Sequence, residues 1–152
     1  MSSEILLPMH DRSDAEYHQA LVKELVDIFR VRGFRILGAE NIPGLPQPLP
    51  LPNDGYGDQE EKTPDVIGYD EKNRCVVIGE AKTGERDLET DHALTQYNVY
   101  LDQFDARRGT RATLYIIIPA SKVPEFNSLI THYIHPDYWK HIVVVPSSAL
   151  PL

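Results

Sequence analysis

Two carboxylates and a lysine are spaced so that they could form one reaction centre. Glu80 and Lys82 lie two apart at the end of an apolar run, Cys75 to Ala81, which has the composition of a β-strand. Side chains two apart leave the same face of a strand, so Glu80 and Lys82 should point the same way. Asp65 begins the preceding strand-like run, and a hairpin between the two runs would place its carboxylate beside Glu80.

This trio suits a divalent cation better than a structural role, because buried charges lose hydration unless they are paired or bound to metal. The carboxylates of Asp65 and Glu80, the backbone carbonyl of Ala81 and several waters form a ligand set that Mg²⁺ prefers and that Mn²⁺ can also use. The metal would acidify a bound water, and Lys82 would orient that water or stabilise the developing charge. The predicted reaction is phosphodiester hydrolysis.

The segments Pro64-Asp65 and Glu80-Ala81-Lys82 resemble the PD-(D/E)xK signature of the restriction-endonuclease-like superfamily, which includes archaeal Holliday-junction resolvases and many exonucleases. The resemblance implies that Asp65 and Glu80 bind the metal and that Lys82 assists the attacking water. It also implies DNA as the substrate and an α/β fold, with a mixed central sheet flanked by helices in the order αβββαβ. A C-terminal helix and strand would follow this core.

Gln96 and Tyr100 lie four apart in the helical pattern that follows the motif. They resemble the Gln-xxx-Tyr pair of nuclease modules in bacterial recombination enzymes. Residues one helical turn apart face the same side, where an amide and a phenol could touch a phosphate or position Lys82. The alternative is that Tyr100 belongs to the core and Gln96 to the solvated surface.

The superfamily usually takes a further acidic ligand from its first helix, and the sequence offers three candidates for this position. The apolar stripe of that helix continues toward Asp14 and His18, and geometry therefore favours these two. Glu16 stays open, because helix starts fray and the first turn can bend toward a metal. Of the three, His18 is the predicted metal ligand, since an imidazole can bind metal or relay protons.

The helices and strands predicted around the motif follow from the periodicity of apolar residues and from the residues that cap or end helices and form turns. The predicted helices cover residues 13–32, 90–104 and 124–133, with Ser13 and Thr90 as N-caps and Gly33 ending the first. The predicted strands cover residues 34–40, 65–69, 75–81, 112–118 and 141–145. Residues 112–118 are apolar enough for a central strand buried on both faces.

Residues 41–62 are expected to be a long loop, because five prolines, followed by Gly55 and Gly57, interrupt any helix or paired strand. A loop of this length is usually functional or mobile. It directly precedes Asp65, so we expect it to lie over the active site and to be able to close on DNA.

Length and composition predict one domain over residues 1–152. The N-terminus lacks the pattern of a signal peptide, which suggests a cytoplasmic protein. Cys75 is the only cysteine, so an internal disulfide and a Cys-rich zinc site are excluded. No membrane or organic cofactor is implied. A homodimer is a possible assembly, with the hydrophobic C-terminal segment as its interface.

The net charge of −8 argues against extensive phosphate contact, although Arg30, Arg32 and Arg35, and Arg107, Arg108 and Arg111, form two local basic clusters. The leading hypothesis is a Mg²⁺-dependent deoxyribonuclease. Its main alternative is a catalytically inactive or partner-activated module of the same fold that binds nucleic acid or protein. A lesser alternative is a charged cluster that serves only stability or metal storage.

Overall fold

The computed structural model describes residues 3–55, 57 and 59–148, with side chains from residue 14 onward. Its elements are α1 (Ser3–Val31), β1 (Arg35–Ala39), β2 (Val66–Asp70), β3 (Cys75–Ala81), α2 (Asp91–Leu101), β4 (Phe104–Asp105), β5 (Thr110–Arg111), β6 (Thr113–Pro119), α3 (Val123–Tyr133) and β7 (Ile142–Ser147), with 3₁₀ helices η1 (Ala120–Lys122) and η2 (Pro136–His141).

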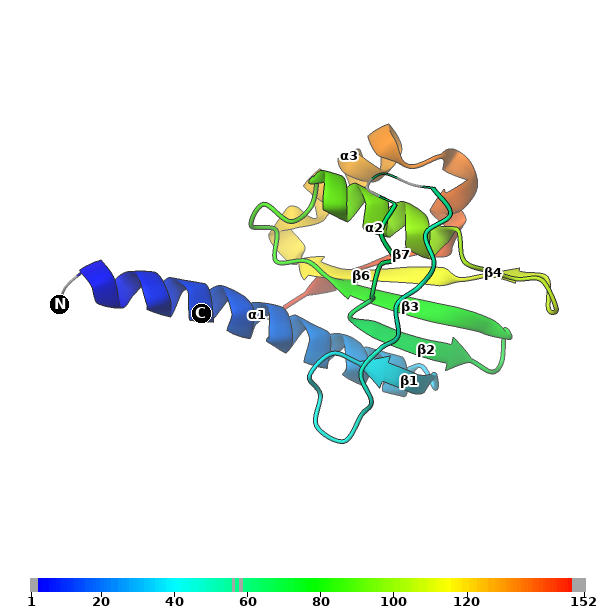
Figure 1. Cartoon of the computed structure of the whole chain (residues 1–152), viewed down its shortest axis with the longest axis horizontal. Coiled ribbons are helices and arrows are strands. Elements are labelled where there is room, and N and C mark those ends of the chain that lie inside the picture. Colours follow the sequence, from blue (N-terminus) through cyan, green and yellow to red (C-terminus); the bar gives the residue numbers. More distant parts are fainter. Residues whose placement is uncertain (1–2, 56, 58, 149–152) are drawn as a thin grey trace.

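Five strands form one mixed sheet in the order β1-β2-β3-β6-β7 (Figure 1). The strands β1, β2 and β3 pair antiparallel, whereas β3, β6 and β7 are parallel to one another. The prediction of an α/β fold with a mixed sheet is confirmed, and so is the central position of the most apolar strand. β6 lies between two neighbours, and its residues from Leu114 to Ile118 are buried.

Helices cover both faces of the sheet. The apolar stripe of α1, including Leu21, Leu25 and Phe29, packs on one face against Val77 and Ala81. On the other face, α2 and α3 pack against alternate residues of the same strands. Glycine at position 79 permits close packing of α1, because a Cβ there would lie 2.5 Å from a methyl carbon of Leu25.

The boundaries of two predicted helices are corrected, and one short hairpin was not predicted. α1 begins at Ser3, so Ser13 is an interior residue and not an N-cap. A serine caps a helix only where the residues before it are not helical, and here those residues belong to the helix. Thr90 does cap α2, with its hydroxyl accepting from the Ala93 amide at 3.0 Å, but this helix ends at Leu101. The β4–β5 hairpin was not predicted, because its two-residue strands are too short to show alternation.

The long loop lacks regular helix and strand in its described part and crosses the sheet as a strap, which we define as residues 46–52 and 59–64 (Figure 1). Its two arms pair once, at Leu51 and Lys62. The backbone of Pro48 lies against Gly38 of β1, and the Pro52 carbonyl accepts from Gln103 beyond α2. None of the described helices is long and apolar enough to span a membrane.

Candidate functional site

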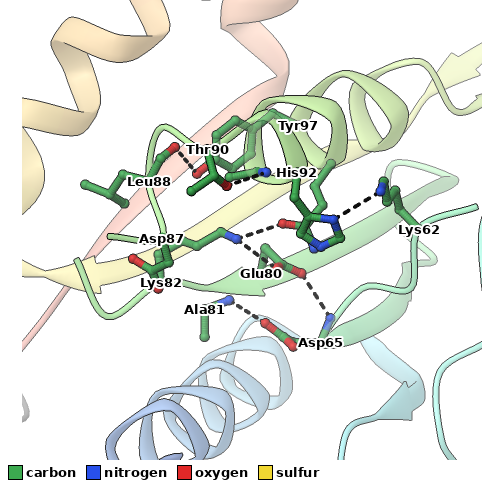
Figure 2. Close-up of polar contacts among 12 residues, drawn as sticks. Lys62, Asp65, Glu80, Ala81, Lys82, Asp87, Leu88, Thr90, His92 and Tyr97 are labelled. Atoms are coloured by element: carbon green, nitrogen blue, oxygen red, sulfur yellow. Dashed lines mark hydrogen bonds and ion pairs between the residues drawn. The ribbon is translucent and has the colours of Figure 1, made fainter. Parts of the chain in front are cut away.

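The β2–β3 register brings Asp65 and Glu80 together at one end of the sheet (Figure 2). Val66 pairs with Gly79, so Asp65 lies next to Glu80 on the adjacent strand. The Asp65 amide donates to Glu80 Oε1 at 3.3 Å, and the Ala81 amide donates to Asp65 Oδ2 at 2.8 Å. Backbone hydrogen bonds therefore hold both carboxylates, as expected where charged groups are buried.

Lys82 completes the predicted trio. Its ammonium lies 3.3 Å from Glu80 Oε2 and donates to Gln96 Oε1 at 2.8 Å (Figure 2). The chain leaves β3 through a tight turn in which the Asp87 carboxylate accepts from the amides of Thr83 and Gly84. This turn fixes the direction of the backbone directly after Lys82.

Gln96 and Tyr100 both lie on the buried side of α2, as the four-residue spacing predicts. The Tyr100 side chain is fully buried, and its hydroxyl has no hydrogen-bond partner among the described residues. Burial, followed by the charges of Glu80 and Asp65, raises the pKa of Tyr100, so this phenol stays protonated. A buried donor without a partner is rare and is often found where a ligand or water binds.

His18 is the only one of the three first-helix candidates found in a potential metal-binding group of the described residues. His18 Nε2 lies 3.3 Å from Asp65 Oδ2, whereas the Glu16 side chain is exposed to solvent. Asp14 is not part of this group. The helical stripe that points α1 at the sheet thus brings the imidazole to the carboxylates.

Glu40 is a site residue that the sequence reasoning missed. It directly follows β1, and its amide donates to the Asp65 carbonyl at 2.8 Å. One potential ligand atom each from His18, Glu40 and Asp65 lies within 4.8 Å of the others. The available signal was the antiparallel pairing of β1 with β2, which puts the end of one strand opposite the start of the other.

The cluster holds protons in an unusual way. A hydrogen bond to Asp65, then burial and the Asp65 charge, raise the pKa of Glu40 to about 7. Burial is also the largest influence on Asp65 and would raise its pKa, but hydrogen bonds from His18 and Glu40 outweigh it and lower that pKa. The pKa of His18 is raised, chiefly by its hydrogen bond to Asp65. Asp65 is therefore the carboxylate that carries the charge.

Glu80 differs from the expected pattern, because both of its oxygens already have partners, the Asp65 amide and Lys82. Burial and the Asp65 charge raise the pKa of Glu80 to about 8, while Lys82 opposes this shift. The candidate ligand group is accordingly His18, Glu40 and Asp65, with Glu80 beside it. One imidazole and two carboxylates fit a divalent cation such as Mn²⁺, and carboxylates with water fit Mg²⁺.

A second unpredicted contact lies beside the trio, where the strap meets α2. Lys62 is almost completely buried, with 2% of its surface exposed, and its ammonium lies 3.1 Å from His92 Nδ1 (Figure 2). A buried ammonium requires polar partners. No sequence signal distinguished Lys62 from other loop lysines, since its burial depends on how the strap folds over the sheet.

Access to the site is one-sided. Asp65, Glu80, Lys82, Gln96 and Tyr100 are all buried, whereas His18 and Glu40 are partly exposed. A cavity of about 180 Å³ adjoins Glu40 and is lined by Gln47, Pro48, Thr63 and Pro64 of the loop and strap. A small ligand would therefore meet the His18–Glu40 side first.

The arrangement can bind a divalent cation and present an ammonium, an amide and a phenol to an anion next to it. These are the functional groups expected of a site that hydrolyses a phosphate ester. No family model, curated protein or solved structure matches this chain.

Proposed function

We propose that this protein is a divalent-metal-dependent nuclease that hydrolyses phosphodiester bonds of DNA. The observation that carries the proposal is the convergence of Asp65, Glu80 and Lys82 beside the His18–Glu40 pair. A mixed sheet flanked by helices is also compatible with the PD-(D/E)xK fold that the motif resembles.

The proposed roles follow from the contacts of each residue. His18, Glu40 and Asp65 would hold the cation, with Glu80 available as a further ligand once it gives up its proton. A bound divalent cation supplies two effects, a lower pKa for a coordinated water and neutralisation of charge on the phosphate. Lys82 donates a hydrogen bond to the attacking water or to a non-bridging phosphate oxygen, and Gln96 holds its ammonium in place.

In the overall reaction, water forms a new bond to phosphorus, the bond from phosphorus to one ester oxygen breaks, and that oxygen leaves as an alcohol after taking a proton. The Tyr100 hydroxyl lies near the Gln96 and Glu80 side chains without a well-formed hydrogen bond to the described residues, and it would donate to a phosphate oxygen. This completes a set of donors that electrostatic stabilisation of a phosphorane-like state requires.

The test is cleavage of labelled linear, single-stranded, flap and four-way-junction DNA with Mg²⁺ or Mn²⁺. We expect Glu80→Gln and Lys82→Met to reduce the rate by roughly a hundredfold or more, the range for loss of a group that stabilises the transition state. Glu16→Gln and Lys23→Met make the same chemical changes on the exposed surface of α1 and should cleave like the parent. Circular dichroism checks that each variant is folded.

A binding module without catalysis is the second candidate, and one observation favours it. Lys82 already contacts Glu80 and donates to Gln96, so its ammonium has partners before any substrate arrives. If no DNA is cleaved with either metal while DNA binding persists, the nuclease proposal fails and this alternative replaces it.

A further inference from the structure

One end of the molecule carries most of its positive charge. Residues 30–35, 69–74 and 105–111, which we call the basic end, contain eight of the fifteen lysines and arginines but only three of the 23 acidic residues. The chain as a whole has a net charge of −8. The cations are Arg30, Arg32, Arg35, Lys72, Arg74, Arg107, Arg108 and Arg111.

The fold brings these three segments together although they are far apart in sequence. They belong to the end of α1 with the start of β1, to the β2–β3 turn and to the β4–β5 hairpin (Figure 1). The Thr110 hydroxyl donates to the Arg74 carbonyl at 2.9 Å, which joins the hairpin to the β2–β3 turn. The hairpin and the β2–β3 turn thus form one surface, whereas Arg32 of the first cluster packs over the Tyr115 ring on the α1 side of the sheet.

Tyr69 is at the centre of this surface. Arg35 is its cross-strand partner, and the guanidinium carbons of Arg35 and Arg108 lie 5.8 and 5.6 Å from its ring centroid. Stacking on an aromatic ring restricts the motion of an arginine, so less entropy is lost when it binds a phosphate. The Arg35 and Arg108 side chains remain 65% and 49% exposed.

The acidic partners of these arginines do not prevent phosphate binding. Arg35 pairs with Glu71 at 3.4 Å and Arg108 with Asp105 at 2.9 Å, both at the surface. Exposed ion pairs of this kind contribute little to stability, so exchange of the carboxylate for a phosphate costs little.

The part of the basic end around Tyr69 and the reaction centre share a face of the sheet. Asp65, Ile67 and Tyr69 alternate along one strand, so their side chains point to the same face. Four residues at about 3.3 Å each separate Asp65 from Tyr69 by roughly 13 Å, which corresponds to about four base-pair steps of 3.4 Å. The strap crosses between them, where Pro48 lies against Gly38, the register partner of Ile67.

We propose that the basic end binds the phosphodiester backbone of DNA at an anchoring site separate from the reaction centre, about four base-pair steps away. This inference rests on the proposed nucleic-acid substrate. It explains how a chain with so much acidic charge can bind DNA, since the positive charge is concentrated where the strand would lie and the acidic charge is elsewhere.

The test is fluorescence anisotropy with labelled duplex and single-stranded DNA over about 50 to 200 mM salt, in EDTA to prevent cleavage. We expect the Arg35→Gln/Arg108→Gln double variant to reduce the salt dependence, the slope of log K against log [salt], by about 2 on duplex or about 1.4 on a single strand. Arg74→Gln/Arg107→Gln should act similarly, and both of these residues are exposed to solvent. Lys23→Gln/Lys140→Gln removes the same charge elsewhere and should leave the slope unchanged.

An equal change of slope in the control and in the arginine variants would overturn the inference, as would failure of the parent to bind either DNA at low salt. The form of DNA that the basic end binds, duplex or single strand, is the one for which the arginine variants reduce the salt dependence. Cleavage is scored separately. If DNA binding depends on the arginines but no DNA is cleaved, the anchoring site is supported and the nuclease proposal fails. If DNA is cleaved and neither arginine double variant changes the cleavage, only the anchoring site is rejected.

Discussion

Among single residues, the contact between the Glu40 and Asp65 carboxyl groups bears most directly on how the candidate site would bind a proton or a metal. Like-charged carboxylates in contact cannot both ionise easily, so one keeps its proton near neutral pH. Here Asp65 ionises, because His18 and the Ala81 amide also donate to it, and Glu40 stays protonated up to about pH 7. A cation would replace that proton, which makes Glu40 the residue whose role is easiest to test.

Glu40→Gln should weaken Mn²⁺ binding by roughly tenfold or more, because an amide oxygen is a poorer ligand than a carboxylate. Isothermal titration calorimetry measures this directly. Glu16→Gln, on the exposed side of α1, serves as the matched control and should bind like the parent. Equal affinities in parent and Glu40→Gln would remove Glu40 from the metal site.

At the scale of elements, the packing of α1 on the sheet positions His18. Leu25 and Phe29 lie against Gly79, the residue directly before Glu80, so the helix and the reaction centre depend on the same close contact. A methyl group at position 79 would have to displace Leu25 or lift the helix away from the sheet, and the His18 imidazole would move with it.

Gly79→Ala should lower the free energy of unfolding by about 1–3 kcal/mol, the usual cost of overpacking a core. Urea denaturation of the single variants and of Gly79→Ala/Leu25→Ala gives a double-mutant cycle. Leu25→Ala alone should also destabilise, but it makes room for the new methyl, so the double variant should lose less than the sum of the two. Additive losses would mean that the two residues do not compete for this space.

At the scale of the whole molecule, the raised pKa values of the site link stability to pH. Glu40 and Glu80 titrate near 7 and 8 in the folded chain but near 4.5 when unfolded, so the folded protein binds more protons between these values. Stability without metal should therefore fall as pH rises through this window. The raised pKa of His18 acts in the same direction, whereas the lowered pKa of Asp65 matters only in acid.

Thermal unfolding in EDTA should show a lower midpoint at about pH 8.5 than at about pH 5. Added Mn²⁺ should raise the midpoint more at the higher pH, where protons no longer compete for the ligands. Glu40→Gln should reduce both the change of the midpoint with pH and the effect of Mn²⁺ on the midpoint. A midpoint that rises with pH in EDTA would contradict the proposed protonation of the two glutamates.

The local pattern of the sequence by itself determined the elements and the inner trio. Apolar periodicity placed the helices and the main strands, and two-residue spacing on a predicted hairpin brought Glu80 and Lys82 to the same face as Asp65, because these relations depend only on neighbours along the chain. The four-residue spacing of Gln96 and Tyr100 likewise predicted that both side chains lie on one side of their helix. Short strands and the true start of α1 were missed, since little local signal marks them.

Only the tertiary structure decided which distant residues join the trio. Glu40 reaches Asp65 through the pairing of two strands separated by a long loop, and Lys62 is buried because the strap folds across the sheet. Arg35 and Arg108 both reach the Tyr69 ring because a hairpin lies beside the β2–β3 turn. Each of these contacts depends on register and chain path between segments far apart in sequence. Local propensity carries no information on such pairings, so they are fixed only when the whole sheet closes its core.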